Sequence, residues 1–274
     1  MKPCTFGLLS LLLALVIACS AAVTPAEPAQ LTREDSSPEE STGREEDAQA
    51  LHRQRLEQAL EKLNGVITDT PSRYHHERAG VLFRMDRFEE AVKDYDMAVR
   101  FGRPHSGDSC WERGLALYYT GDFRGGEEQF YRYHRVGPLD IENGLWRFLC
   151  IAEEEGTEKA REAILDYSQK VRMPFPALLD LYLERGTAEA VVEQAKERTP
   201  PPRQLTTNLF YAHYYIGKYY EIIEDEERAL LHVREALKHS IAHFMYACAQ
   251  ADERRLAARK NAEPKNSGAS KVPR

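Results

Sequence analysis

Apolar side chains recur at a spacing of three to four residues over most of the chain, which predicts amphipathic helices. The pattern repeats itself with an offset of 35 residues, so that Phe88 aligns with Phe123 and Tyr95 aligns with Phe130. Self-similarity at a fixed period is typical of repeat proteins. We therefore expect successive pairs of helices, each pair packed on the next.

Small residues mark the points where the two helices of a pair are expected to cross. In three units they lie twelve residues apart, and these pairs are Ala79 with Ala91, Gly114 with Gly126, and Gly217 with Ala229. Two helix backbones can approach closely only where the side chains between them are small. The clear units are predicted at about 72–105, 107–138 and 210–240.

The intervening segments follow the same plan less regularly. Residues 141–198 predict two further helix pairs, broken at Gly156 and at Gly186, and the prolines at 200–202 predict a rigid loop. Residues 47–64 predict an entry helix, and 241–259 predict a closing helix that caps the stack. The sequence thus predicts one continuous helical domain over 47–259.

These units resemble the tetratricopeptide repeat (TPR), whose period is about 34 residues. Pro138 falls at the closing proline position of that repeat, where it ends a helix. The resemblance implies an all-α, TPR-like α-solenoid of stacked antiparallel helix pairs. It also implies a concave groove, lined by the first helix of each pair, that binds protein partners.

The groove positions implied by the resemblance are rich in aromatic residues. They are His76, Phe83, Arg84, Trp111, Leu115, Tyr118, Tyr119, Trp146, Tyr211, Tyr214 and Lys218. Exposed Trp and Tyr side chains suit partner contacts, because they bury a large area with few rotors to immobilise. The alternative for Trp111 and Trp146 is packing against neighbouring helices, which is the commoner fate of tryptophan.

The first residues predict export. A positive start is followed by an apolar run from Thr5 to Ala18, so 1–18 is predicted to be a signal peptide. The end of this run, Val16 to Cys19, resembles the bacterial lipobox, which implies that Cys19 is lipidated. Cleavage after Ala22, which would give a free secreted protein, is the alternative.

Both ends of the chain are poor in large apolar residues. Residues 19–46 are acidic and contain several prolines and serines, and 260–274 are basic. Such segments bury too little apolar surface to fold, so we expect a disordered tether and a disordered basic tail. Export signal and repeats together resemble the NlpI type of envelope lipoprotein, which implies an outer-membrane lipoprotein facing the periplasm. A soluble periplasmic protein is the alternative.

Neither charge nor motifs favour nucleic-acid binding or catalysis. The formal net charge of the 274 residues is −7, which argues against nucleic-acid partners. His75 and His76 point to different helix faces, and His239 and His243 lack a third ligand, so neither a metal nor a cofactor is expected. No hydrolase or phosphate-binding motif is present. The cysteines at 110, 150 and 248 are expected to be free thiols, with a disulfide left open.

Taken together, the sequence predicts a non-catalytic envelope adaptor that binds other envelope proteins or peptides through its groove and is held to the membrane by a lipid. A self-associating assembly component, and thus a homo-oligomer, is the first alternative. A metal or small-ligand binder, or an enzyme, is the second.

Overall fold

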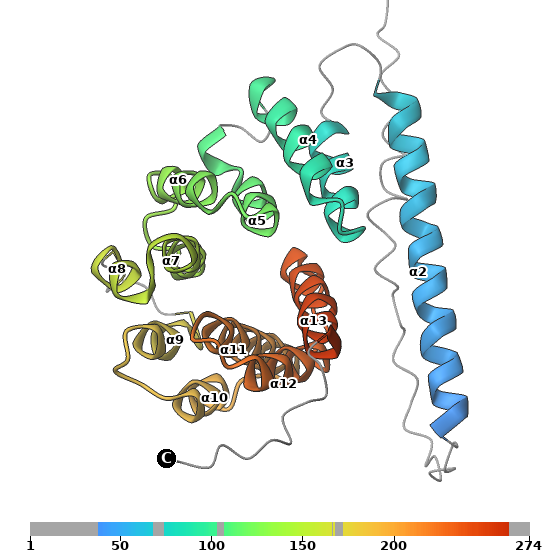
Figure 1. Ribbon diagram of the computed structural model, residues 1–274. Helices are drawn as coiled ribbons and strands as arrows, with labels where there is room; N and C mark the ends of the chain where they lie inside the picture. The colour runs from blue at the N-terminus through green and yellow to red at the C-terminus, as the bar shows by residue number, and fades with distance from the viewer. Residues whose placement is uncertain (1–37, 68–73, 103–106, 166, 168–171, 263–274) are drawn as a thin grey trace, which may run out of the picture. The chain divides into compact units, whose positions relative to one another are not determined.

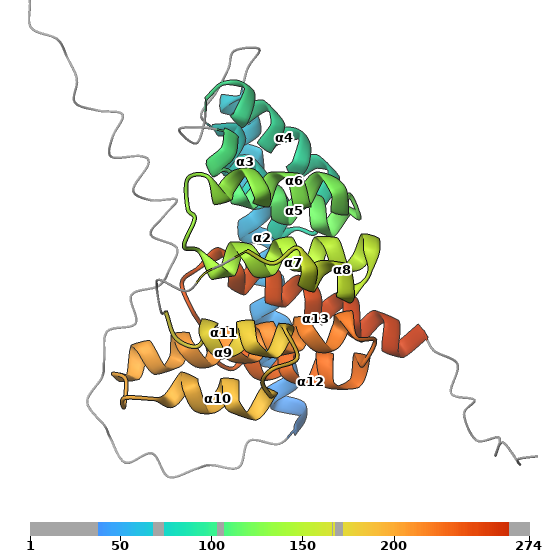
Figure 2. The same cartoon turned by 90° about the vertical axis from the view of Figure 1, so that its left-hand side faces the viewer.

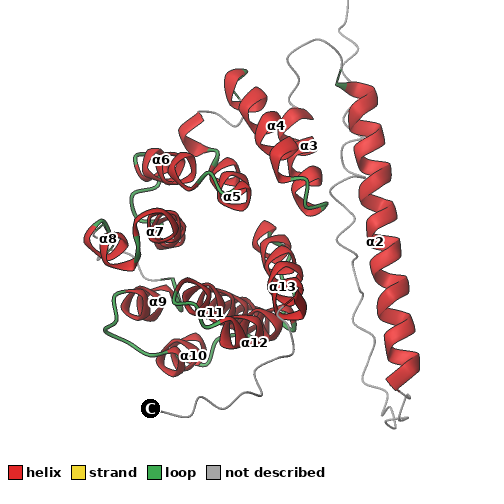
Figure 3. Cartoon of the chain, in the orientation of Figure 1, coloured by secondary structure: helices red, strands yellow, loops and turns green. Residues whose placement is uncertain are grey.

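The computed structural model describes residues 38–67, 74–102, 107–165, 167 and 172–262 (Figure 1). All regular structure in these ranges is helical, which confirms the all-α prediction (Figure 3). None of the helices described is both long and apolar enough to cross a membrane. Cys19, the signal peptide and the tail from residue 263 lie outside the described ranges.

The chain divides into two compact units, 1–66 and 67–274. Helix α2 (Pro38–Val66) belongs to the first unit and begins inside the segment 19–46, which was expected to be a disordered tether. Most of its side chains between 47 and 66 are exposed, because polar residues occur on all of its faces. The sequence predicted one continuous domain over 47–259, whereas the contacts within the chain place this helix in a unit separate from the one that begins at Ile67.

The second unit consists of short helices joined by tight turns. Its elements are α3 (Tyr74–Arg84), α4 (Phe88–Arg100), η1 (Gly107–Ser109), α5 (Trp111–Thr120), α6 (Phe123–His134), α7 (Ile141–Glu155), α8 (Thr157–Glu162), α9 (Phe175–Tyr182), α10 (Ala188–Lys196), α11 (Pro202–Ile222), α12 (Glu226–Leu237) and α13 (Phe244–Ala262). Neighbouring helices in this order pack on each other from α3 to α8 and from α9 to α13. Figure 2 shows the succession from α3 and α4 at one end to α10 and α12 at the other.

Local signals explain where these helices begin and end. Asp122, Asp140 and Asp225 each accept a hydrogen bond from the amide three residues later, as N-cap residues do. Gly156 separates α7 from α8 with a φ of 93°, which suits glycine. The predicted loop at 200–202 is shorter than expected, because Pro202 is already the first residue of α11.

The small residues lie where the helices of a pair approach most closely. A Cβ atom added to Gly114 would lie 2.7 Å from the ring of Phe130. One added to Gly217 would lie 2.8 Å from Cγ2 of Val233 and 3.1 Å from the carbonyl oxygen of Ala229. The close approach inferred from the twelve-residue spacing is thus present between α5 and α6 and between α11 and α12.

Replacing Gly217 by alanine is expected to lower the free energy of unfolding by about 1–3 kcal/mol, because the added methyl group overpacks the contact with α12. This loss exceeds the gain of up to about 1 kcal/mol in helix propensity. Gly80→Ala is the control, since its new Cβ would meet first the flexible end of Arg84, at 3.3 Å. Urea denaturation of both variants checks the prediction, and equal stabilities would contradict it.

Candidate functional site

The inner side of the second unit is occupied by its own last helix. Figure 1 shows α13 on the side of the arc that α3, α5 and α11 face. A closing helix was predicted over 241–259, and α13 packs on the preceding helix α12 as such a helix would. Its side chains also contact the beginning of the unit, as the ion pair of Arg254 with Asp86 on the turn after α3 shows.

The start of α13 is held by aromatic contacts. The ring of Phe244 lies 4.8 Å from that of Phe83 and 5.7 Å from that of Trp111. The guanidinium of Arg84 lies 4.8 Å from the Phe244 ring centroid, within the range of a cation–π contact. His243, directly before the helix, stacks on Trp111 with ring centroids 5.9 Å apart. Apolar and aromatic surface thus fixes the entry of α13.

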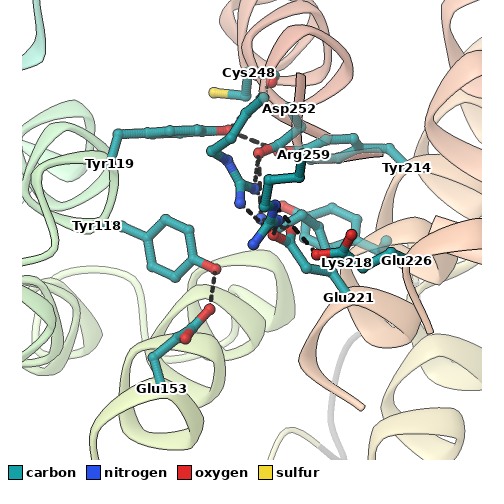
Figure 4. A network of polar contacts seen from close by, with 12 residues as sticks. Tyr118, Tyr119, Glu153, Tyr214, Lys218, Glu221, Glu226, Cys248, Asp252 and Arg259 are labelled. Atoms are coloured by element: carbon teal, nitrogen blue, oxygen red, sulfur yellow. Dashed lines mark hydrogen bonds and ion pairs between the residues drawn. The ribbon is translucent and has the colours of Figure 1, made fainter. Parts of the chain in front are cut away.

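The middle of α13 is held by a buried carboxylate. Asp252 is fully buried and accepts hydrogen bonds from Tyr119 and Tyr214, each at 2.9 Å (Figure 4). The guanidinium of Arg255 donates to it at 2.6 Å, and Nζ of Lys218 lies 3.4 Å away. Helices α5, α11 and α13 therefore meet at this one carboxylate.

Lys218 and Glu221 extend this cluster along α11. Lys218 is fully buried, donates to Glu221 at 2.8 Å and lies 4.7 Å from the ring centroid of Tyr118. Arg255 and Arg259 also pair with Glu221. Burial opposes the charged form of Glu221, but the attraction of Lys218 and Arg255 outweighs it and holds the pKa of this carboxyl well below its usual range. We call Lys218, Glu221, Asp252, Arg255 and Arg259 the inner ion network.

The structure brings the predicted groove residues together, but most of them are not exposed. Those buried are Phe83, Leu115, Tyr118, Trp146, Tyr211, Tyr214 and Lys218. His76, Arg84, Trp111 and Tyr119 are partly buried. The expectation of an open aromatic groove is therefore wrong, because α13 covers part of this surface and neighbouring helices cover the rest. Trp146, for example, packs against Tyr118 at 5.3 Å between ring centroids.

A cavity of about 200 Å³ remains beside the start of α13. Its aromatic lining residues are Trp111, Phe130, Tyr133 and Trp146, and its charged ones are Asp140, Glu142 and Arg172. A cavity of about 150 Å³ can hold a benzene ring, so this one has room for a single side chain or one peptide unit. Of the predicted groove residues, it retains Trp111 and Trp146.

Two polar atoms of the cavity's lining residues are unsatisfied. Oδ1 of Asn143 and Nε1 of Trp146 are buried, and neither has a hydrogen-bond partner among the described residues. The two residues are three positions apart on α7, so they lie on the same face of the helix. The indole nitrogen can only donate, whereas the amide oxygen can only accept. This face of α7 therefore carries one unpaired donor and one unpaired acceptor.

The charged rim of the cavity is tied to α11. Glu142 pairs with Arg172 and accepts a hydrogen bond from Tyr215 at 2.9 Å. Burial raises the pKa of Glu142 in spite of the neighbouring guanidinium. Arg172 also lies 4.8 Å from the ring centroid of Tyr211 and 4.3 Å from that of Phe175. These contacts hold one positive and one negative side chain at the edge of the cavity.

The three described cysteines lie in the helical core. Cys110, Cys150 and Cys248 are buried free thiols, so the alternative of a disulfide between them does not hold in this structure. Burial raises the pKa of Cys110 to about 12, which keeps it in the protonated, weakly nucleophilic form. These residues therefore act as small packed side chains.

Sequence reasoning missed the contribution of α13 to the site. Asp252, Arg255 and Arg259 belong to the predicted closing helix, and their spacing places them on one helix face. Lys218 and Glu221 stand three residues apart within an aromatic helix, which is a detectable signal of a buried ion pair. No model of a known protein family matches the chain.

Proposed function

We propose that the chain is a non-catalytic protein-binding scaffold, with the helix pairs of a TPR-like solenoid, that holds a segment of a partner protein at the cavity beside α13. The observation that carries the proposal is the pair of buried, unsatisfied polar atoms on α7 among the aromatic residues that line this cavity. A buried donor or acceptor without a partner costs about 1–3 kcal/mol, so a ligand that satisfies both gains that free energy on binding.

An amide group is the ligand that matches this pair. Peptide groups and the side chains of Asn and Gln each carry both an acceptor, which Nε1 of Trp146 lacks, and a donor, which Oδ1 of Asn143 lacks. The aromatic rings of Trp111 and Tyr133 supply apolar walls for the rest of an inserted side chain. The partner segment is therefore an extended or looped peptide that places one amide in the cavity.

The cellular setting is part of the same proposal. Lipidation of Cys19 would hold the scaffold at the outer membrane, facing the periplasm, and the partners would then be other envelope proteins or peptides. This part rests on the residues before Pro38, which lie outside the described ranges. It is supported by the apolar run that ends at Ala18 and by the residue types directly before Cys19.

The proposal predicts that Trp111→Ala lowers the recovery of a specific partner by at least about tenfold, because truncation of a central aromatic contact commonly costs 2 kcal/mol or more. The full chain is immobilised and incubated with detergent-solubilised envelope proteins, and recovery is measured by quantitative mass spectrometry. Leu231→Ala is the matched control, since Leu231 is 62% exposed on α12, outside the cavity lining.

Circular dichroism shows whether each variant is folded before it is used. Partners count as specific only if the wild-type chain and Leu231→Ala recover them equally. Equal recovery by Trp111→Ala would contradict the proposal, and so would the absence of any protein that meets this criterion.

A further inference from the structure

Histidines from two helices and the following turn gather between α11 and α12. The Nδ1 atoms of His213 on α11 and His232 on α12 are 3.1 Å apart. His239, directly after α12, stacks on His213 with ring centroids 6.1 Å apart. Ligand atoms of His213, Glu235 and His239 all lie within 4.8 Å of one another. Two imidazoles and a carboxylate therefore lie close to one another, and a third imidazole, that of His232, lies beside His213.

The backbone holds these side chains in place without a bound ion. Helices α11 and α12 are packed closely through Gly217 and Ala229. His232 and Glu235 are three positions apart on α12 and so share a face. The carboxylate of Glu235 pairs with Lys238 at 2.5 Å, and Lys238 is largely exposed, so it can withdraw into solvent. The positions of the donors are thus set by helix packing.

The donor set matches the preferences of a first-row transition metal. Zinc binds imidazole nitrogen at about 2.0–2.1 Å and carboxylate oxygen at about 2.0–2.2 Å, in tetrahedral geometry. Two nitrogens bound to one tetrahedral ion are therefore about 3.3 Å apart, close to the separation of the His213 and His232 nitrogens. Imidazole ligands suit Zn²⁺, Cu²⁺ and Ni²⁺, whereas Ca²⁺ and Mg²⁺ require oxygen ligands.

We propose that His213, Glu235 and His239, with His232 beside His213, form a binding site for a divalent transition-metal ion, with Zn²⁺ as the ion best suited to it. The ion would join α11, α12 and the turn that leads into α13. Partial burial agrees with this role, since it lowers the pKa of His213 to about 4 and that of His232 as well, which leaves the rings neutral and able to ligate near pH 7.

A second group of potential ligands serves as the internal control. His76, Cys110 and Glu112 also bring ligand atoms within 4.8 Å of one another. Here, however, the Cys110 side chain is fully buried in the helical core, so an ion in solvent does not reach the thiol. His76→Asn is therefore expected to leave zinc binding unchanged.

Zinc titration of the purified, metal-free full chain by isothermal calorimetry tests the site. The wild-type chain is expected to bind one Zn²⁺ ion. His213→Asn and His239→Asn are each expected to weaken zinc binding by more than about 100-fold, because loss of a residue that only supports a ligand already weakens metal binding by up to about 100-fold. Zinc at a hundred times its Kd should also raise the Tm of the wild-type chain by about 5 °C. Cobalt substitution provides a spectroscopic check, since tetrahedral Co²⁺ absorbs strongly in the visible range.

If the zinc titration shows no binding to the folded wild-type chain, the proposal is overturned. So would an affinity that falls with His76→Asn and stays unchanged with His213→Asn. Circular dichroism confirms that each variant is folded, and Leu231→Ala, again on the exposed face of α12, controls for surface substitution near the site.

Discussion

Asp252→Ala is expected to lower the free energy of unfolding by about 3–5 kcal/mol, the loss that follows when one partner of a buried charge cluster is removed. The substitution leaves the fully buried ammonium of Lys218 without one of its two carboxylates. It also removes the acceptor that the hydroxyl groups of Tyr119 and Tyr214 share. Denaturation followed by circular dichroism measures the loss.

The neighbouring residue on α13 provides the control. Glu253 pairs with Arg234 at the surface, with 26% of its side chain exposed, so Glu253→Ala is expected to cost at most about 1 kcal/mol. Amide hydrogen exchange locates the effect, because Asp252→Ala should accelerate exchange in α13 more than in α4 or α6. A loss for Asp252→Ala no larger than that for Glu253→Ala would show that the inner ion network does not hold α13.

Trp146→Ala is expected to lower the free energy of unfolding by about 3–5 kcal/mol, as truncation of a buried tryptophan commonly does. Its ring is 2% exposed and lies between Tyr118 on α5 and Tyr214 and Tyr215 on α11, so its removal opens a void where three helices meet. Denaturation with urea measures the change.

The Trp146→Phe substitution separates the contribution of ring packing to the free energy of unfolding from that of the indole N–H group. It keeps most of the aromatic contact and removes an N–H group that has no partner among the described residues. Replacing an unsatisfied buried donor by an apolar group removes a penalty, so we expect a loss well below that of Trp146→Ala. Equal losses for the two substitutions would mean that the indole nitrogen is satisfied in the folded protein, which would weaken the assignment of the cavity.

The helix pairs could be predicted because their signals are local. The small residues at Gly114 and Gly217, and the break at Gly156, act on neighbouring helices or on the backbone itself. The identities of the inner-face residues followed from the resemblance to the repeat, and two of them, Phe83 and Tyr119, do meet in the structure.

The position of α13 could not be predicted, because it depends on contacts between distant parts of the sequence. Asp86 and Arg254 are 168 residues apart, and nothing in the spacing of either segment indicates the other. Apolar residues followed by charged ones fit an end cap as well as a helix that folds back. The exposure of Tyr214 and Lys218 was misjudged for the same reason, since Asp252, which contacts both side chains, belongs to α13.

The fold-back of α13 has a consequence for how the protein is made. Pairs such as α3 with α4 involve near neighbours in sequence and can form early. The surface around Phe83, Tyr119 and Tyr214 contacts α13, which is synthesised after the helices that carry these residues. Until α13 has been synthesised, the nascent chain exposes an aromatic surface to which chaperones can bind and through which the chain can aggregate. In a simple repeat array, loss of the terminal element removes only its contacts with one neighbour. A stop codon near residue 240 would have a larger effect here. The truncated protein would lack α13 and would expose the aromatic surface around Phe83, Tyr119 and Tyr214 to solvent.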